Sequence, residues 1–194
     1  MLVIGVTGMP GAGKDVFYEV ATNLGFIVIK MGELVREETR KRGLPIDAEH
    51  VGRVAVALRE ERGTDAIAKL TIQKIKKIIE AERKPKIIFI EGIRSLDEVK
   101  TLKSYFGEMH VLAIHASPKT RYQRIIKRKR VDDNISLESI IQRDLRELSF
   151  GIGNVIAMAD FILINENKTL EDFRTECKKF IDEILRLKKM RLKK

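Results

Sequence analysis

Residues 8–15 read GMPGAGKD, and this glycine-rich stretch decides how the rest of the chain is read. It matches the phosphate-binding P-loop pattern G-x-x-x-x-G-K-[ST] at every position except the last. An apolar run at 2–6 predicts a buried strand before it, and apolar spacing over 14–24 predicts a helix after it. This is the setting in which loop amides and a helix N-terminus point at phosphate oxygens.

The loop residues are therefore predicted to bind the phosphates of ATP. Lys14 is expected to reach the β- and γ-phosphates and to act in catalysis. The predicted ATP-binding residues are Gly8, Met9, Pro10, Gly11, Ala12, Gly13, Lys14 and Asp15.

Asp15 stands where the pattern has a Ser or Thr hydroxyl that ligates Mg²⁺. A carboxylate is also a hard oxygen donor, so Asp15 is the predicted metal ligand. Its extra negative charge beside the phosphates must then be offset by the metal and by arginines. The alternative is a relaxed motif that binds nucleotide without turnover.

Short apolar runs alternate with helical patterns along the whole chain, which predicts a parallel sheet with helices on both faces. The predicted strands are 2–6, 26–29, 87–90, 110–115 and 161–164. We see no linker or repeat, so residues 1–194 are predicted to form a single α/β domain with a three-layer α/β/α sandwich. Helical excursions at 33–63 and 118–148 interrupt the alternation.

Composition narrows the class of protein. The 194 residues are 44% hydrophobic and 34% charged, which is typical of a globular chain. No apolar run approaches the ~18 residues that span a bilayer, so no membrane association is expected. The first residues lack the features of a secretory signal. The single cysteine, Cys177, suits a reducing compartment, is predicted to lie in the core, and favours a cytoplasmic location.

A formal net charge of +10 points toward anionic ligands, either phosphates or a nucleic-acid backbone, unless it only solubilises the surface. The three histidines, His50, His110 and His115, do not have the spacing of metal ligands. Magnesium bound with the nucleotide is the only metal that the sequence suggests.

The segment IIFIEGIRS, residues 87–95, places an acidic residue at the end of the third predicted strand. P-loop enzymes use this position for a group near the metal or the attacking oxygen. Glu91 is thus the candidate ligand of a metal-bound water, or the general base, and Arg94 is a candidate contact of the acceptor phosphate. The alternative for Glu91 is a local hydrogen-bonding role.

The segment 117–133, SPKTRYQRIIKRKRVDD, predicts a strongly basic helix. Arg121, Arg124 and Arg128 share one helical face, and Arg130 precedes an Asp-Asp pair. Phosphoryl transfer needs such positive charge. The segment resembles the lid of nucleotide kinases, which supplies such arginines and carries a similar Arg-x-Asp-Asp, and this resemblance implies that Arg128 and Arg130 act in catalysis from a short lid. A merely solvated basic helix is the alternative, and Arg143 and Arg146 on the returning helix are weaker candidates.

Several of these motifs, together with GELVREE at 32–38 and ADFILIN at 159–165, resemble archaeal adenylate-kinase-like P-loop proteins of mostly uncharacterised function. These proteins are related to nucleoside monophosphate kinases and to dephospho-CoA kinase. The resemblance implies a five-stranded sheet in the order 2-3-1-4-5, ATP with Mg²⁺, and a small phosphorylated or hydroxyl acceptor. It also implies that Arg36 grips the acceptor phosphate, although an arginine in surface charge pairs is the alternative. In related kinases Asn165 would lie near the base.

The sequence therefore favours an ATP-dependent kinase whose acceptor is bound by Arg36 and Arg94. The rival interpretation is a nucleotide-dependent switch that binds RNA or a ribosomal particle, supported by the charge, the basic helix and the KKMRLKK tail. Few aromatic residues accompany the basic ones, which weighs against nucleic acid as the partner.

Overall fold

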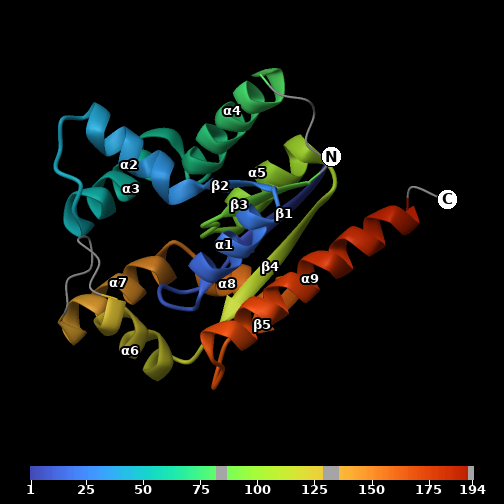
Figure 1. Cartoon of the computed structure of the whole chain (residues 1–194). Coiled ribbons are helices and arrows are strands. Elements are labelled where there is room, and N and C mark those ends of the chain that lie inside the picture. Colours follow the sequence, from blue (N-terminus) through green and yellow to red (C-terminus); the bar gives the residue numbers. More distant parts are fainter. Residues whose placement is uncertain (82–86, 129–135, 192–194) are drawn as a thin grey trace.

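The computed structural model describes residues 1–81, 87–128 and 136–191 (Figure 1). Its centre is a five-stranded sheet in which every pairing is parallel. The strands are β1 (Leu2–Thr7), β2 (Ile27–Lys30), β3 (Ile87–Glu91), β4 (Met109–His115) and β5 (Phe161–Ile164). They run in the order β2-β3-β1-β4-β5, which confirms the predicted fold class and strand order.

Helices connect the strands and extend the domain beyond the sheet. They are α1 (Lys14–Asn23), α2 (Met31–Lys41), α3 (Ala48–Arg62), α4 (Ala66–Ala81), α5 (Leu96–Phe106), α6 (Pro118–Arg128), α7 (Leu137–Ser149), α8 (Ile152–Ala157) and α9 (Leu170–Arg191). The predicted strands and the predicted helix over 14–24 agree with the observed elements to within one residue at each end. α8, in contrast, lies in a segment for which the sequence patterns predict no element.

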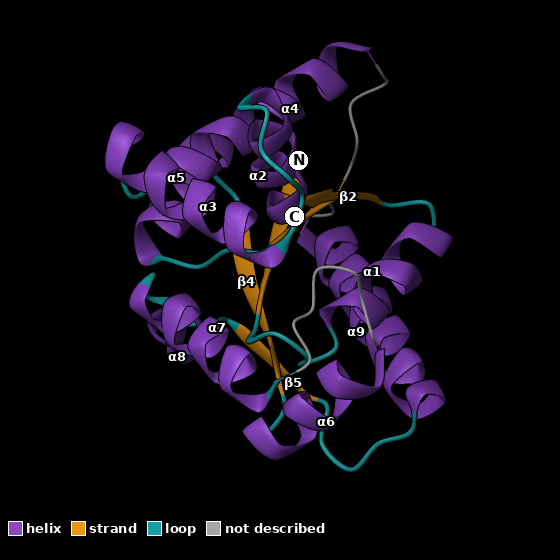
Figure 2. Ribbon diagram, turned by 90° about the vertical axis from the view of Figure 1, so that its left-hand side faces the viewer, coloured by secondary structure: helices purple, strands orange, loops and turns teal. Residues whose placement is uncertain are grey.

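Side chains alternate along the strands and feed two separate cores. On β1, Leu2, Ile4 and Val6 face a core closed by α1 and α9, while Val3 faces the opposite core beneath α4, α5 and α8. Figure 2 shows α1 and α9 on one side of the sheet and α5 and α8 on the other. Cys177 is buried in the α1–α9 core, as predicted.

The carboxyl ends of the parallel strands position the site. β1 ends at the P-loop, β2 ends at Lys30 and β3 ends at Glu91, so the three lie at one edge of the sheet. In Figure 1 the α2–α3 pair and the α6–α7 pair lie at this same edge, on either side of the loop before α1. Ligands of open α/β sheets bind at such an edge. Within the described ranges, none of the helices is long and apolar enough to cross a membrane.

Candidate functional site

The P-loop is shaped by glycines that no larger residue could replace. At Gly8 the backbone has a φ of +145°, and a Cβ there would lie 2.3 Å from the carbonyl oxygen of Ile114. Asn165, which follows β5, donates from Nδ2 to the carbonyl oxygen of Ala12 and so braces the loop from the other side. These contacts fix the loop between β1 and α1, as the sequence pattern predicts.

Lys14 begins α1 and turns back over the loop. Its ammonium donates to the carbonyl oxygens of Gly8 at 2.6 Å and of Met9 at 3.2 Å. Burial lowers the pKa of Lys14, while Glu91 opposes this shift and favours the charged form. The ammonium is thus held at the mouth of the loop, where a phosphate would replace the carbonyls as its partner.

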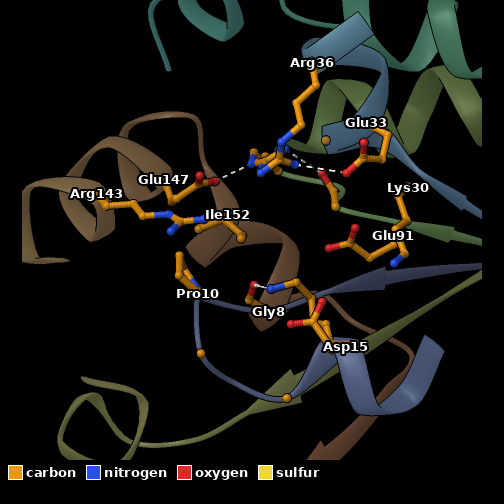
Figure 3. Close-up of a pocket in the computed structure, with 16 residues that line it drawn as sticks. Gly8, Pro10, Asp15, Lys30, Glu33, Arg36, Glu91, Arg143, Glu147 and Ile152 are labelled. Atoms are coloured by element: carbon orange, nitrogen blue, oxygen red, sulfur yellow. Dashed lines mark hydrogen bonds and ion pairs between the residues drawn. The ribbon is translucent and has the colours of Figure 1, made fainter. Parts of the chain in front are cut away.

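Glu91 is the last residue of β3 and lies in register with Lys30 at the end of β2. Burial raises the pKa of the Glu91 carboxyl, and the cations Lys14 and Arg94 counteract this shift. Figure 3 shows the Glu91 and Lys30 side chains on the wall of the cavity that faces Asp15 and the P-loop. Glu91 and Asp15 thus line the same cavity as the P-loop, and the role of Glu91 stays a prediction.

Arg94 lies just beyond β3 and forms an ion pair with Glu147 of α7, through its Nε. Its Nη1 also donates to the carbonyl oxygen of Gly92 at 3.3 Å. Although burial opposes the charge, the Glu147 carboxylate raises the pKa of Arg94 above its ordinary value. Arg94 is therefore firmly charged, and part of its donor capacity is already used by the protein.

Two more arginines reach the cavity from opposite sides. Arg36 extends from α2 and Arg143 from α7, both toward the middle of the cavity (Figure 3). Arg36 also pairs with Glu33 at 3.1 Å, so the surface charge pair considered as its alternative exists alongside its place in the cavity wall. The cavity has a volume of about 340 Å³ and brings together Lys14, Asp15, Arg36, Glu91 and Arg94, the predicted residues that lie far apart in the sequence.

Two of the three arginines predicted to share one face of α6 are held by contacts within the protein. Arg121 is buried in a two-bond ion pair with Asp144 of α7, at 3.0 and 2.6 Å, and donates to the carbonyl oxygen of Pro10 at 3.0 Å. Arg124 donates to the backbone and side-chain oxygens of Asn165. Both arginines therefore brace the loops around the P-loop.

The two predicted catalytic arginines of the lid cannot be placed. Arg130, with Asp132 and Asp133, lies outside the described residues, as does the side chain of Arg128 at the end of α6. Their roles stay predictions.

Sequence reasoning missed Lys30 and Glu147. Lys30 ends β2, and the rule that parallel strands share a carboxyl edge would have placed it beside Glu91. Glu147 is four residues after Arg143 on the same helix, a spacing that puts both side chains on one face. Neither signal reveals the partner, Arg94, because that contact depends on how α7 packs.

The described residues hold no cluster of three or more His, Cys, Asp or Glu side chains arranged to bind a metal ion. His50 instead donates to Asp47 and helps to cap α3, and His110 packs against the ring of Phe161. The carboxylates of Asp15, in the first turn of α1, and of Glu91, at the end of β3, nevertheless line the same cavity.

Comparisons with known proteins agree with this picture. A family model described as an AAA domain matches residues 7–141. The chain is 46% identical over 185 residues to a UPF0200 protein of Methanocaldococcus jannaschii. The matched region covers 95% of this chain and 91% of that protein.

Two solved kinases share the fold. The chain is similar to a dephospho-CoA kinase from Campylobacter jejuni, with a TM-score of 0.54 and 23% identity over 94% of this chain and 96% of that one. It is also similar to a gluconokinase from Sinorhizobium meliloti, with a TM-score of 0.54 and 13% identity over 98% and 97% of the two chains.

Proposed function

The chain belongs to the UPF0200 family, and from its P-loop kinase-like fold and its cavity we propose that it is an ATP-dependent phosphotransferase with a small phosphorylated acceptor. One observation carries this proposal. A single cavity joins a P-loop and its lysine to arginines that come from α2, from the β3–α5 loop and from α7. A nucleotide-binding switch needs the first part of this arrangement, but it does not need several arginines placed to hold a phosphorylated acceptor.

The roles of the residues follow from the charge that develops during transfer. The loop amides and Lys14 hold the β- and γ-phosphates, and Arg36 and Arg94 hold the acceptor. Arg143 faces the space between them, where it would stabilise the transferring phosphoryl group. We also assign Arg128 and Arg130 to this task, as lid residues. Such catalysis consists mainly of positioning and of preorganised positive charge.

Asp15 and Glu91 suit a magnesium ion bound together with ATP. Mg²⁺ usually takes one or two protein carboxylates, several waters and phosphate oxygens, so a many-carboxylate cage is not needed. Asp15 lies in the first turn of α1 and Glu91 ends β3, and both line the same cavity. The ion would neutralise charge on the phosphates as ATP binds.

Replacing Asp15 with alanine is expected to raise the Mg²⁺ concentration needed for half-maximal activity by about tenfold or more, because a ligand is lost. Asp15→Ser, which restores the usual hydroxyl, should stay near the wild-type value. A magnesium titration of ATP-dependent label transfer measures both. An unchanged Mg²⁺ requirement in Asp15→Ala would remove Asp15 from the metal site.

The activity of the wild-type protein is expected to fall at acidic pH at a point above the ordinary carboxyl range. Glu91 works as a base, or as a ligand of metal-bound water, only in its deprotonated form, and burial raises the pKa of this carboxyl. Activity is therefore present above the raised pKa and lost as the pH falls through it. In Glu91→Gln this acidic limb should disappear at a lower overall rate. A profile of kcat/KM against pH with the same limb in both proteins would contradict the role.

The direct test is incubation with γ-labelled ATP and Mg²⁺ against nucleoside monophosphates, dephospho-CoA and small phosphorylated metabolites. Label on an acceptor supports the kinase. Label released only as inorganic phosphate would favour the switch that binds RNA, whose affinity should fall steeply with salt. The inward contacts of Arg121 and Arg124 weaken that rival, because these side chains do not form an outer basic surface.

A further inference from the structure

A small annex opens from the acceptor side of the main cavity. It lies between α2, α3 and α7 and has a volume of about 80 Å³. The residues that it shares with the main cavity are Gly32, Arg36, Arg94, Arg143 and Glu147. An acceptor held at these shared arginines would therefore extend its remaining atoms into the annex.

The charged residues of the annex are unbalanced in favour of an anion. Its lining holds four arginines, Arg36, Arg94, Arg143 and Arg146, against two carboxylates, Asp47 and Glu147. The excess of two positive charges matches a phosphate monoester, which carries about −1.5 to −2 near neutral pH. Burial, aided by the neighbouring Arg143 and Arg94, lowers the pKa of Arg146. A bound anion would relieve this crowding of partly desolvated cations.

The remaining wall of the annex is apolar. Val35 of α2, Val51 and Ala55 of α3, and Phe150 at the end of α7 contribute it. These side chains offer no hydrogen-bonding groups with which to read the edge of a base. An aliphatic chain would fit this wall, since its contact requires only the exclusion of water.

Arg146 limits how far an acceptor can reach. Its guanidinium lies against α3 at Gly52, where a Cβ would be only 2.6 Å from Nη1 and 2.8 Å from Cζ. Only glycine leaves room for the arginine at this point of α3. At about 10–15 Å³ for each water-sized group, the annex holds roughly five to eight such groups, fewer than the heavy atoms of a purine base.

We propose that the acceptor is the monophosphate ester of a short aliphatic alcohol, that its chain occupies this annex, and that Arg146, seated on Gly52, excludes nucleoside monophosphates. This inference rests on the proposed kinase function. An oxygen of the acceptor phosphate forms the new bond to the γ-phosphorus of ATP, and the bond from that phosphorus to the β–γ bridging oxygen breaks. The electron pair leaves with ADP, and the product is the diphosphate ester. A proton carried by a monoprotonated acceptor phosphate is released to solvent.

The experiment compares butyl phosphate, AMP and butanol as acceptors of label from γ-labelled ATP, with the full-length wild-type protein. We expect kcat/KM for butyl phosphate to exceed that for AMP by about tenfold or more, since the adenine base of AMP is too large for the annex and must displace Arg146. Butanol, which lacks the anion, should receive no label.

Two variants test the part played by Arg146. Arg146→Ala opens the annex and should shift the ratio of the two kcat/KM values toward AMP by on the order of tenfold. Gly52→Ala displaces only the end of a flexible side chain, so the fold should persist. By pushing the Arg146 guanidinium away from α3 and into the annex, it should raise KM for butyl phosphate by about tenfold, with KM for ATP unchanged. Arg53→Ala, an exposed arginine next to Gly52, is the matched control and should change none of these values.

The outcomes separate the inference from the proposed function. Transfer to AMP at an equal or greater kcat/KM than to butyl phosphate overturns the inference and leaves the kinase standing. An unchanged acceptor ratio in Arg146→Ala overturns the role of Arg146. Label released as inorganic phosphate, with no labelled acceptor, overturns both the inference and the kinase.

Discussion

Replacing Lys14 with alanine is expected to lower kcat/KM for phosphoryl transfer by about 10³-fold, while the fold persists. In the proposed function the ammonium holds the donor phosphates, and it lies in the cavity beside Glu91 and Asp15. It donates to the carbonyl oxygens of Gly8 and Met9. Its loss removes charge stabilisation that the transition state needs and that a water molecule cannot supply.

The stability of Lys14→Ala should be close to that of the wild type. Its two side-chain hydrogen bonds contribute about 1 kcal/mol each, which corresponds to a Tm shift of at most ~4–8 °C in a domain of this size, and removing a buried charge offsets part of this loss. Single-turnover transfer from γ-labelled ATP and thermal unfolding separate the two effects. Lys119→Ala, which changes an exposed lysine of α6, is the control for lost charge alone. Turnover of Lys14→Ala at the wild-type rate would refute the assignment of the site.

The largest loss of stability is expected from Glu98→Ala. Glu98 is fully buried at the start of α5, where it accepts from Arg59 Nη2 of α3 at 2.7 Å and from the backbone N–H of Arg94 at 2.7 Å. The Arg59 side chain is only 9% exposed and lies over the ring of Phe150, 4.2 Å from its centroid. Removing the carboxylate leaves this guanidinium buried without its counter-charge.

Breaking one side of a buried ion pair typically costs about 3–5 kcal/mol, which is a large part of the ~5–15 kcal/mol that stabilises a domain. The Tm of Glu98→Ala should therefore fall by roughly 6–20 °C. Glu61→Ala is the matched control, because it breaks the exposed pair with Arg42, whose closest N–O distance is also 2.7 Å. Exposed pairs contribute little, so its Tm should stay near that of the wild type. Equal Tm values for the two variants would show that burial of the Glu98 pair has no energetic consequence.

The fold could be predicted because its signals are local. Continuous apolar runs mark strands that are covered on both faces, and residues Ile87 to Ile90 of β3 are such a run. Glycine and capping residues mark helix ends, as Asp47 and Gly63 do for α3. α8 could not be predicted in this way. A helix of six residues is too short to show a helical period, and the glycine before it, Gly151, is typical of an ordinary turn.

The site could be predicted where the sheet edge dictates it and not where helices pack on one another. Lys14 and Glu91 follow strands, so the order of the parallel strands brings them together. The partner of Arg121 lies on α7, and a helical face alone does not say whether it meets solvent, phosphate or Asp144. The pairing of Arg94 with Glu147 is hidden for the same reason.

Two ion pairs made by α7 also have a thermodynamic consequence. Through Asp144 and Arg121 this helix is tied to the P-loop carbonyl of Pro10, and through Glu147 it holds Arg94 on the acceptor side. A single helix thus contacts groups at both ends of the cavity, and a displacement of α7 would alter both contacts at once. Any coupling that results between the affinities for the two substrates must be reciprocal, so each substrate would strengthen or weaken the binding of the other by the same factor.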